Sequence, residues 1–184
     1  MSTTGVTCQD GSVAFAFVSG NLALDFAGTL KWRRAFPEEL LATPDDLARW
    51  AVEAGVLTEP PALGAEDLDR LKILREAVYR LVTDPRPDDR HLVNDYAAGP
   101  PPAVRIDADR VVRTGDADSV GWAIAWAMAE LLSDPPGDRM RECERTACTR
   151  IFIDRSRTAN RRWCGMEECG NRIKAATYRA RKGA

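Results

Sequence analysis

Apolar residues recur at helical spacing through much of residues 12–133. The clearest stretch is 65–83, where charged residues are interspersed with an apolar face made of Leu68, Leu71, Leu74, Val78, Leu81 and Val82. A stripe with this period predicts an amphipathic helix that packs one face against a core. We therefore expect the N-terminal part of the chain to be built mainly from helices.

Signals at the ends of other apolar segments predict four further helices. Asn21 and Thr43 are good N-cap residues, and each directly precedes a periodic segment, the first of which extends to Leu30. Helices are also expected at 88–98 and 118–133. The segment 118–133 is apolar around much of its circumference, which predicts that it is the central helix of the core.

Short alternating segments predict a small amount of β structure. Apolar and small residues alternate over 13–17, a pattern typical of a strand. The segments 104–106 and 111–113 flank a polar turn and predict a β-hairpin. Together with the helices, these segments place the chain in a mainly α fold class with a small β element.

Four of the five cysteines form two pairs near the end of the chain. Four residues separate Cys143 from Cys148, four separate Cys164 from Cys169, and fifteen lie between the pairs. This spacing predicts one structural zinc ion per chain, held by four thiolates with no coordination position left for chemistry. Two disulfides, or a zinc site that responds to oxidation, would use the same cysteines. Cys8 lies apart and is expected to be a free thiol.

The residues around these cysteines resemble a known family. The run Cys169-Gly170-Asn171-Arg172, with Trp163-Cys164 before it and Tyr178-Arg179-Ala180-Arg181 after it, looks like the CGNR zinc finger. The segment Phe152-Ile153-Asp154-Arg155-Ser156 also matches. Near the N-terminus, Leu22-Ala23-Leu24-Asp25-Phe26-Ala27-Gly28-Thr29-Leu30 resembles the opening of the ABATE domain that precedes this finger, with Gly28 where the family usually has Asn.

This resemblance implies two domains and a regulatory role. Residues 12–133 would form a helical ABATE-like sensing domain, and residues 139–184 a CGNR finger that resembles a treble clef, in which Cys169 opens a helix running to about Lys182. Residues 134–138 would link the two domains. The implied function is that of a bacterial transcription regulator linked to stress.

The distribution of charge favours a polyanionic partner for the C-terminal part. The net charge of the whole chain is only −2, but residues 139–184 hold 13 lysines and arginines against 5 acidic residues. The remainder holds 13 basic and 23 acidic residues. A basic module on an acidic body is typical of nucleic-acid binding, although attraction between the two parts would give the same pattern.

Base-edge and phosphate contacts require arginine, lysine and asparagine side chains on an accessible face. We expect the DNA-contacting residues to be Arg157, Arg161, Arg162, Asn171, Arg172, Lys174, Arg179 and Arg181. For Asn171 and Arg172, hydrogen bonds that support the zinc site are an equal alternative. Asp25 is a candidate ligand-binding residue, and a structural role near the start of its helix is the alternative.

These features predict a DNA-binding transcription regulator whose N-terminal domain senses a small-molecule or protein effector. The alternative is an adaptor whose finger binds protein or RNA. We do not expect an enzyme, because the sequence shows no nucleophile–base pair, phosphate-binding loop or open metal site. No apolar run reaches the ~18 residues of a membrane helix, and reduced thiols fit a cytoplasmic protein.

Overall fold

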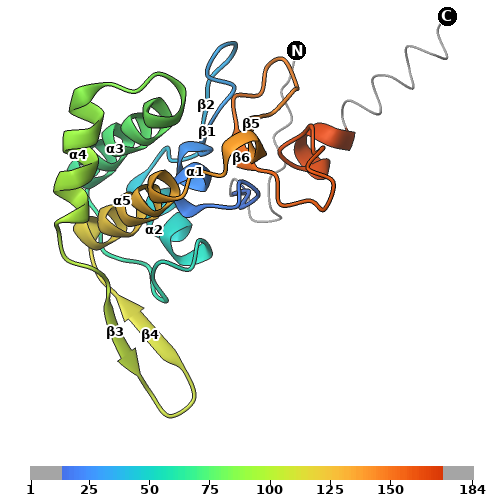
Figure 1. Ribbon diagram of the computed structural model, residues 1–184. Helices are drawn as coiled ribbons and strands as arrows, with labels where there is room; N and C mark the ends of the chain where they lie inside the picture. Colours follow the sequence, from blue (N-terminus) through green and yellow to red (C-terminus); the bar gives the residue numbers. More distant parts are fainter. Residues whose placement is uncertain (1–13, 172–184) are drawn as a thin grey trace, which may run out of the picture.

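A computed structural model describes residues 14–171 and shows a helical body with a C-terminal zinc-finger region beside it (Figure 1). The body contains α1 (Leu22–Ala27), α2 (Pro44–Glu53), α3 (Ala65–Thr83), α4 (Pro87–Ala97) and α5 (Ala117–Ser133). Helix α5, the predicted central helix, packs against α1, α3 and α4, whereas α3 packs against all four of the other helices. The largest fully buried side chains of the body include Phe26, Trp50, Leu71, Leu74, Ile124 and Met128.

Side-chain caps fix the predicted helix starts. The Asn21 side chain accepts hydrogen bonds from the N–H groups of Ala23 and Leu24, and Thr43 forms a reciprocal capping box with Asp46. Helix α1 is shorter than predicted because Gly28 is its C-cap. Leu30 therefore belongs to the following strand and not to the apolar face of that helix.

Three two-stranded antiparallel sheets make up the β structure of the described residues. Strand β1 (Leu30–Lys31) pairs with β2 (Glu38–Glu39), β3 (Ala103–Ile106) with β4 (Val111–Thr114), and β5 (Met140–Glu142) with β6 (Ile151–Ile153). The β3–β4 pair is the predicted hairpin, and it projects away from the helices (Figure 1). The mainly α fold class with a small β element is confirmed.

The predicted strand at 13–17 is wrong for the part that the structure describes. Residues 14–18 form no strand, because their backbone groups bind elsewhere. The carbonyls of Ala16 and Val18 accept hydrogen bonds from Arg150 and Arg161 of the finger region. An alternating pattern can thus mark a segment that docks through arginine side chains instead of through a strand ladder.

The finger region and the body share apolar packing. Ile151 and Ile153 of β6 are buried in the same cluster as the helices, and the N–H of Ile153 donates to the carbonyl of Ser19 at 2.8 Å. Residues 137–139 within and after the expected linker form a short 3₁₀ turn. Whether 12–133 and 139–184 fold as separate units stays a prediction. Within residues 14–171, no helix has both the length and the apolar character needed to cross a bilayer.

Candidate zinc site and adjoining basic groove

Folding brings the four cysteine side chains of the two predicted pairs together. The Sγ atoms of Cys143, Cys148, Cys164 and Cys169 all lie within 4.8 Å of one another, and all four residues are buried. Two of the Sγ–Sγ distances are 3.8 Å, between Cys148 and Cys164, and 3.6 Å, between Cys164 and Cys169.

These distances fit a zinc ion and do not fit disulfides. Four sulfurs at ~2.3 Å from a tetrahedral zinc lie about 3.8 Å apart, which is close to the separations observed. A disulfide requires about 2.05 Å between sulfurs, and all four cysteines are free. The cluster therefore matches a closed Cys₄ site in which zinc would hold the chain together without catalysing a reaction.

The two cysteine pairs lie on different local structures. The first pair lies in the connection between β5 and β6, so one strand precedes it and one follows it. In the second pair, the N–H of Cys164 points at the Sγ of Cys143 at 3.5 Å. Cys169 lies inside a π-helical turn, Met166–Gly170, which begins three residues earlier than the helix start that we predicted.

An apolar wall from both parts of the chain surrounds the cysteine cluster. Phe152 is fully buried against the cysteines, and Val18, Trp32 and Trp163 pack around them. Trp32 comes from the β1–β2 connection of the body and has a positive φ of 51°. Since a bulky side chain rarely adopts this backbone conformation, the surrounding contacts must hold Trp32 over the finger.

Arg145 connects Trp32 with the zinc ligands. Its guanidinium lies 5.4 Å from the centre of the Trp32 ring, and its Nη1 is 3.9 Å from the Sγ of Cys169. A cation beside a thiolate cluster offsets part of its negative charge, and contacts of this kind outside the ligand shell tune metal affinity. The side chain of Arg145 thus belongs to the zinc site, although our sequence analysis did not select it.

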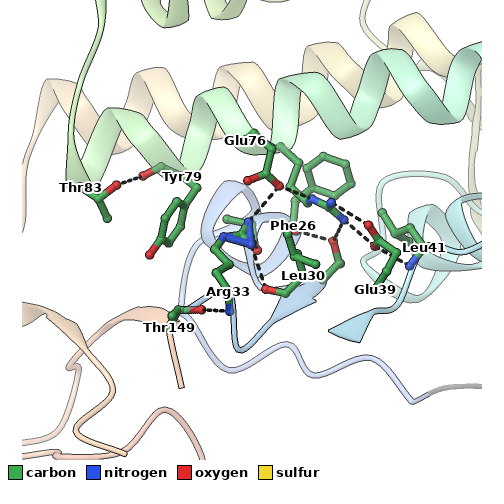
Figure 2. A network of polar contacts seen from close by, with 12 residues as sticks. Phe26, Leu30, Arg33, Glu39, Leu41, Glu76, Tyr79, Thr83 and Thr149 are labelled. Atoms are coloured by element: carbon green, nitrogen blue, oxygen red, sulfur yellow. Dashed lines mark hydrogen bonds and ion pairs between the residues drawn. The ribbon is translucent and has the colours of Figure 1, made fainter. Parts of the chain in front are cut away.

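A polar network ties the β1–β2 connection to both the body and the finger (Figure 2). The Arg33 guanidinium donates to the carbonyls of Ala27 and Leu30 and pairs with Glu76 of α3 at 3.2 Å. The backbone N–H of Arg33 donates to Oγ1 of Thr149 at 3.3 Å. Glu76 also pairs with the buried Arg75, which in turn holds Glu39 of β2. These contacts extend from α3 to the residue that follows Cys148.

Asp154 organises the loop that follows β6. Its carboxylate accepts hydrogen bonds from the N–H groups of Ser156 at 2.9 Å and Arg161 at 2.7 Å. Hydrogen bonding to Ser156, with a further contribution from Arg161, lowers the pKa of Asp154 to about 2. Asp154 lies in the motif that suggested the CGNR resemblance, but only the fold shows what its side chain does.

The predicted DNA-contacting arginines of this loop have different environments. Arg161 donates to the carbonyls of Val18, Trp163 and Cys164 and stacks on Phe152, so its guanidinium supports the finger from within. Arg162 is exposed, lies 5.4 Å from the Trp163 ring centre and pairs with Glu144.

A surface groove follows this loop. Its volume is about 490 Å³, and it is lined by Asn160, Arg161, Arg162, Trp163, Gly165 and Met166. Arg157 is exposed, and no partner for its side chain is found among residues 14–171. Asn171 is also exposed and has helical backbone angles. Arg172, Lys174, Arg179 and Arg181 lie outside the described residues, as does Cys8.

Asp25 lies inside the protein. Its carboxylate accepts a hydrogen bond from the N–H of Ser19 at 2.8 Å, and only 9% of the residue is exposed. Burial raises the pKa of Asp25 above its usual value, although the bond from Ser19 and the charge of Arg150 oppose this shift. The contacts on this side chain come from the chain itself, which is the arrangement expected of a structural residue.

The comparisons with known proteins agree with the domain order expected from the motifs. Residues 20–135 match the model of the ABATE family, described as a "putative stress-induced transcription regulator". Residues 139–182 match the CGNR zinc finger. A search among curated proteins found no match. The chain therefore belongs to the ABATE family and carries a C-terminal CGNR zinc finger.

Proposed function

We propose that this protein is a transcription regulator that binds duplex DNA through its zinc-finger region. The observation that carries this proposal is the groove lined by Arg161, Arg162 and Trp163, directly beside the cysteine cluster. A positively charged groove with an aromatic wall on a rigid metal-bound module suits the backbone of a nucleic acid.

Internal hydrogen bonding does not remove the positive charge of this surface. Arg139, Arg155 and Arg161 donate to backbone carbonyls, which are neutral acceptors. Their guanidinium charges therefore still contribute to the field over the groove. Arg157 and Arg162 are exposed and suited to direct phosphate contact, with Arg162 exchanging Glu144 for a phosphate.

We propose that the helical body acts on the finger through the contacts they share. The network from Glu76 through Arg33 to Thr149 reaches the finger next to Cys148. An effector that shifts α3 or the β1–β2 connection would move Trp32 over the zinc cluster. In this proposal the protein works by binding, without catalysing a reaction.

Salt-dependent binding to duplex DNA tests the proposal. The logarithm of the binding constant should fall with the logarithm of salt concentration, with a slope of ~0.9 per phosphate contact. Arg157→Ala, Arg162→Ala and the double variant Arg179→Ala/Arg181→Ala should each weaken binding to every duplex and reduce the slope by about one unit per arginine removed. Arg90→Ala, which removes an exposed arginine of α4, is the matched control and should change neither quantity.

Two results would overturn this proposal. Unchanged affinity and slope in all three finger variants would remove the basic surface from the interaction. Equal or tighter binding to single-stranded RNA, with no sequence-selective duplex site, would favour the adaptor alternative. Zinc content must be measured in each variant so that loss of the finger is not mistaken for loss of a DNA contact.

A further inference from the structure

The β3–β4 hairpin exposes an apolar face. Val104 and Ile106 lie opposite Arg113 and Val111, and alternation along each strand places all four side chains on the same face. Val104 is 62% exposed, Ile106 81% and Val111 43%. An exposed apolar face of this kind is stabilised when a partner surface covers it.

A groove at the base of the hairpin extends this face onto the body. Its volume is about 410 Å³, and its lining includes Val104 and Arg113 of the hairpin together with Leu22, Pro101, Pro102 and Trp122. Trp122 stacks on Trp126 of α5 at 5.4 Å, and Trp126 is itself 48% exposed. An apolar surface therefore continues from the hairpin tip through the groove to α5.

Two opposite charges lie at the two ends of this surface. Asp109 is exposed in the turn at the tip, where Asp107, and not Asp109, pairs with Arg105 and Arg110. Arg113 is exposed at the groove. Within residues 14–171, neither Asp109 nor Arg113 has an ion-pair partner.

We infer that this surface binds a second copy of the same chain. Two hairpins placed face to face and antiparallel about a two-fold axis would put each tip over the base of the other. Ile106 and Val111 of one copy would then cover Val104 and the groove of its partner. Asp109 of each copy would meet Arg113 of the other. Such reciprocal pairing closes the assembly as a dimer.

The extent of the exposed face favours this occupant over a small molecule. A ligand in the groove would cover Val104 and Trp122 but would leave Ile106 and Val111 in water, since neither of them lines the groove. A second hairpin covers both ends. The apolar tip and the apolar groove lie on one chain together with two complementary charges, so the surface is self-complementary.

Sedimentation of the zinc-loaded full chain over a concentration series, without DNA, tests this inference. The wild-type protein should show twice the 20.3 kDa mass of one chain. Ile106→Asp should raise the dimer dissociation constant at least about tenfold, because two buried isoleucines are lost per dimer. Ile73→Asp, at a position of α3 that is 59% exposed, is the matched control and should leave the dimer intact.

A charge exchange tests the pairing itself. Asp109→Arg and Arg113→Asp should each weaken self-association. An equimolar mixture of the two variants should recover heterodimers, because both reciprocal contacts then join an arginine to an aspartate. The inference is overturned if the wild type has the mass of one chain at every concentration, or if Ile106→Asp and Ile73→Asp dimerise equally.

A separate dye-binding experiment covers the small-ligand alternative. If the apolar anion anilinonaphthalene sulfonate binds saturably to a monomer, and Trp122→Ala abolishes this binding, the groove is a site for a small ligand. Since no DNA is present, failure of the DNA-binding proposal would not affect these outcomes.

Discussion

The guanidinium of Arg150 lies directly over the backbone of Gly28. A Cβ on Gly28 would stand 2.6 Å from Nη1 and 2.9 Å from Cζ of Arg150, which donates to the Gly28 carbonyl at 3.3 Å and to that of Ala16 at 2.8 Å. Arg150 is 5% exposed, so it has little room to move. This contact gives a physical reason for glycine at position 28.

Gly28→Ala should therefore destabilise the protein by about 1–3 kcal/mol, because the added methyl group displaces a buried, hydrogen-bonded arginine. The φ of Gly28 is −71°, so backbone strain would not contribute. Urea unfolding of the single variants and of the double variant with Arg150→Ala measures the coupling. In the Arg150→Ala background the Gly28 substitution should cost almost nothing; an equal cost in both backgrounds would contradict this explanation.

Metal analysis should find one zinc ion per chain. Cys164→Ser should abolish binding, because Cys164 is fully buried and its Sγ lies within 4 Å of two other sulfurs. Cys8→Ser is the control and should retain the metal. Inductively coupled plasma mass spectrometry of both variants checks the ligand set, and zinc retained by Cys164→Ser at the wild-type level would refute it.

Arg145→Ala should weaken zinc binding without abolishing it. The variant removes the cation that lies 3.9 Å from the Sγ of Cys169, and loss of such an outer contact typically lowers metal affinity about 10–100-fold. Competition with a chromophoric chelator measures the change. Arg157→Ala removes an exposed arginine of the same region and should leave the zinc affinity as it is.

Removal of zinc should lower the thermal stability of the helical body. Ile151 and Ile153 bury their side chains in the core that the helices share, and chelation would release the finger that presents them. We expect circular dichroism at 222 nm to keep most of its helical signal at room temperature and to show a lower Tm. The Cys164→Ser variant should not respond to the chelator. An unchanged Tm in the wild type would mean that the body folds independently of the finger.

Asp25→Asn tests whether Asp25 acts as a buried structural residue. The asparagine side chain can keep the bond from the Ser19 N–H while removing a buried charge. Because the folded-state pKa of Asp25 is raised, its contribution to stability is complete below its usual pKa and is lost as pH rises through the folded-state value. The wild type should therefore lose stability as pH rises from about 4 to 7, whereas the asparagine variant should not. The Tm of the variant minus that of the wild type should increase over this range. A pH-independent difference would argue against burial of the charge.

The local patterns of the sequence determined much of the fold. Helical periodicity predicted α3 with the observed bounds, and capping residues such as Asn21 and Thr43 predicted two helix starts, because these features depend on neighbours within one turn. The spacing of the cysteine pairs predicted the cluster, since tetrahedral coordination restricts how two short pairs can meet.

Only the tertiary structure decided which side chains serve the finger from a distance. The helix-period pattern carries no information on contacts between Arg150 and Gly28, or between Trp32 and Arg145, which are separated by more than one hundred residues in each case. The same holds for Arg161, whose charge suggested a DNA contact and whose donors bind the carbonyls of Trp163 in the finger and of Val18 near the N-terminus. Sequence patterns record the preferences of each residue for local conformation and burial, whereas the partner of a buried guanidinium depends on which distant carbonyls the completed fold brings within reach.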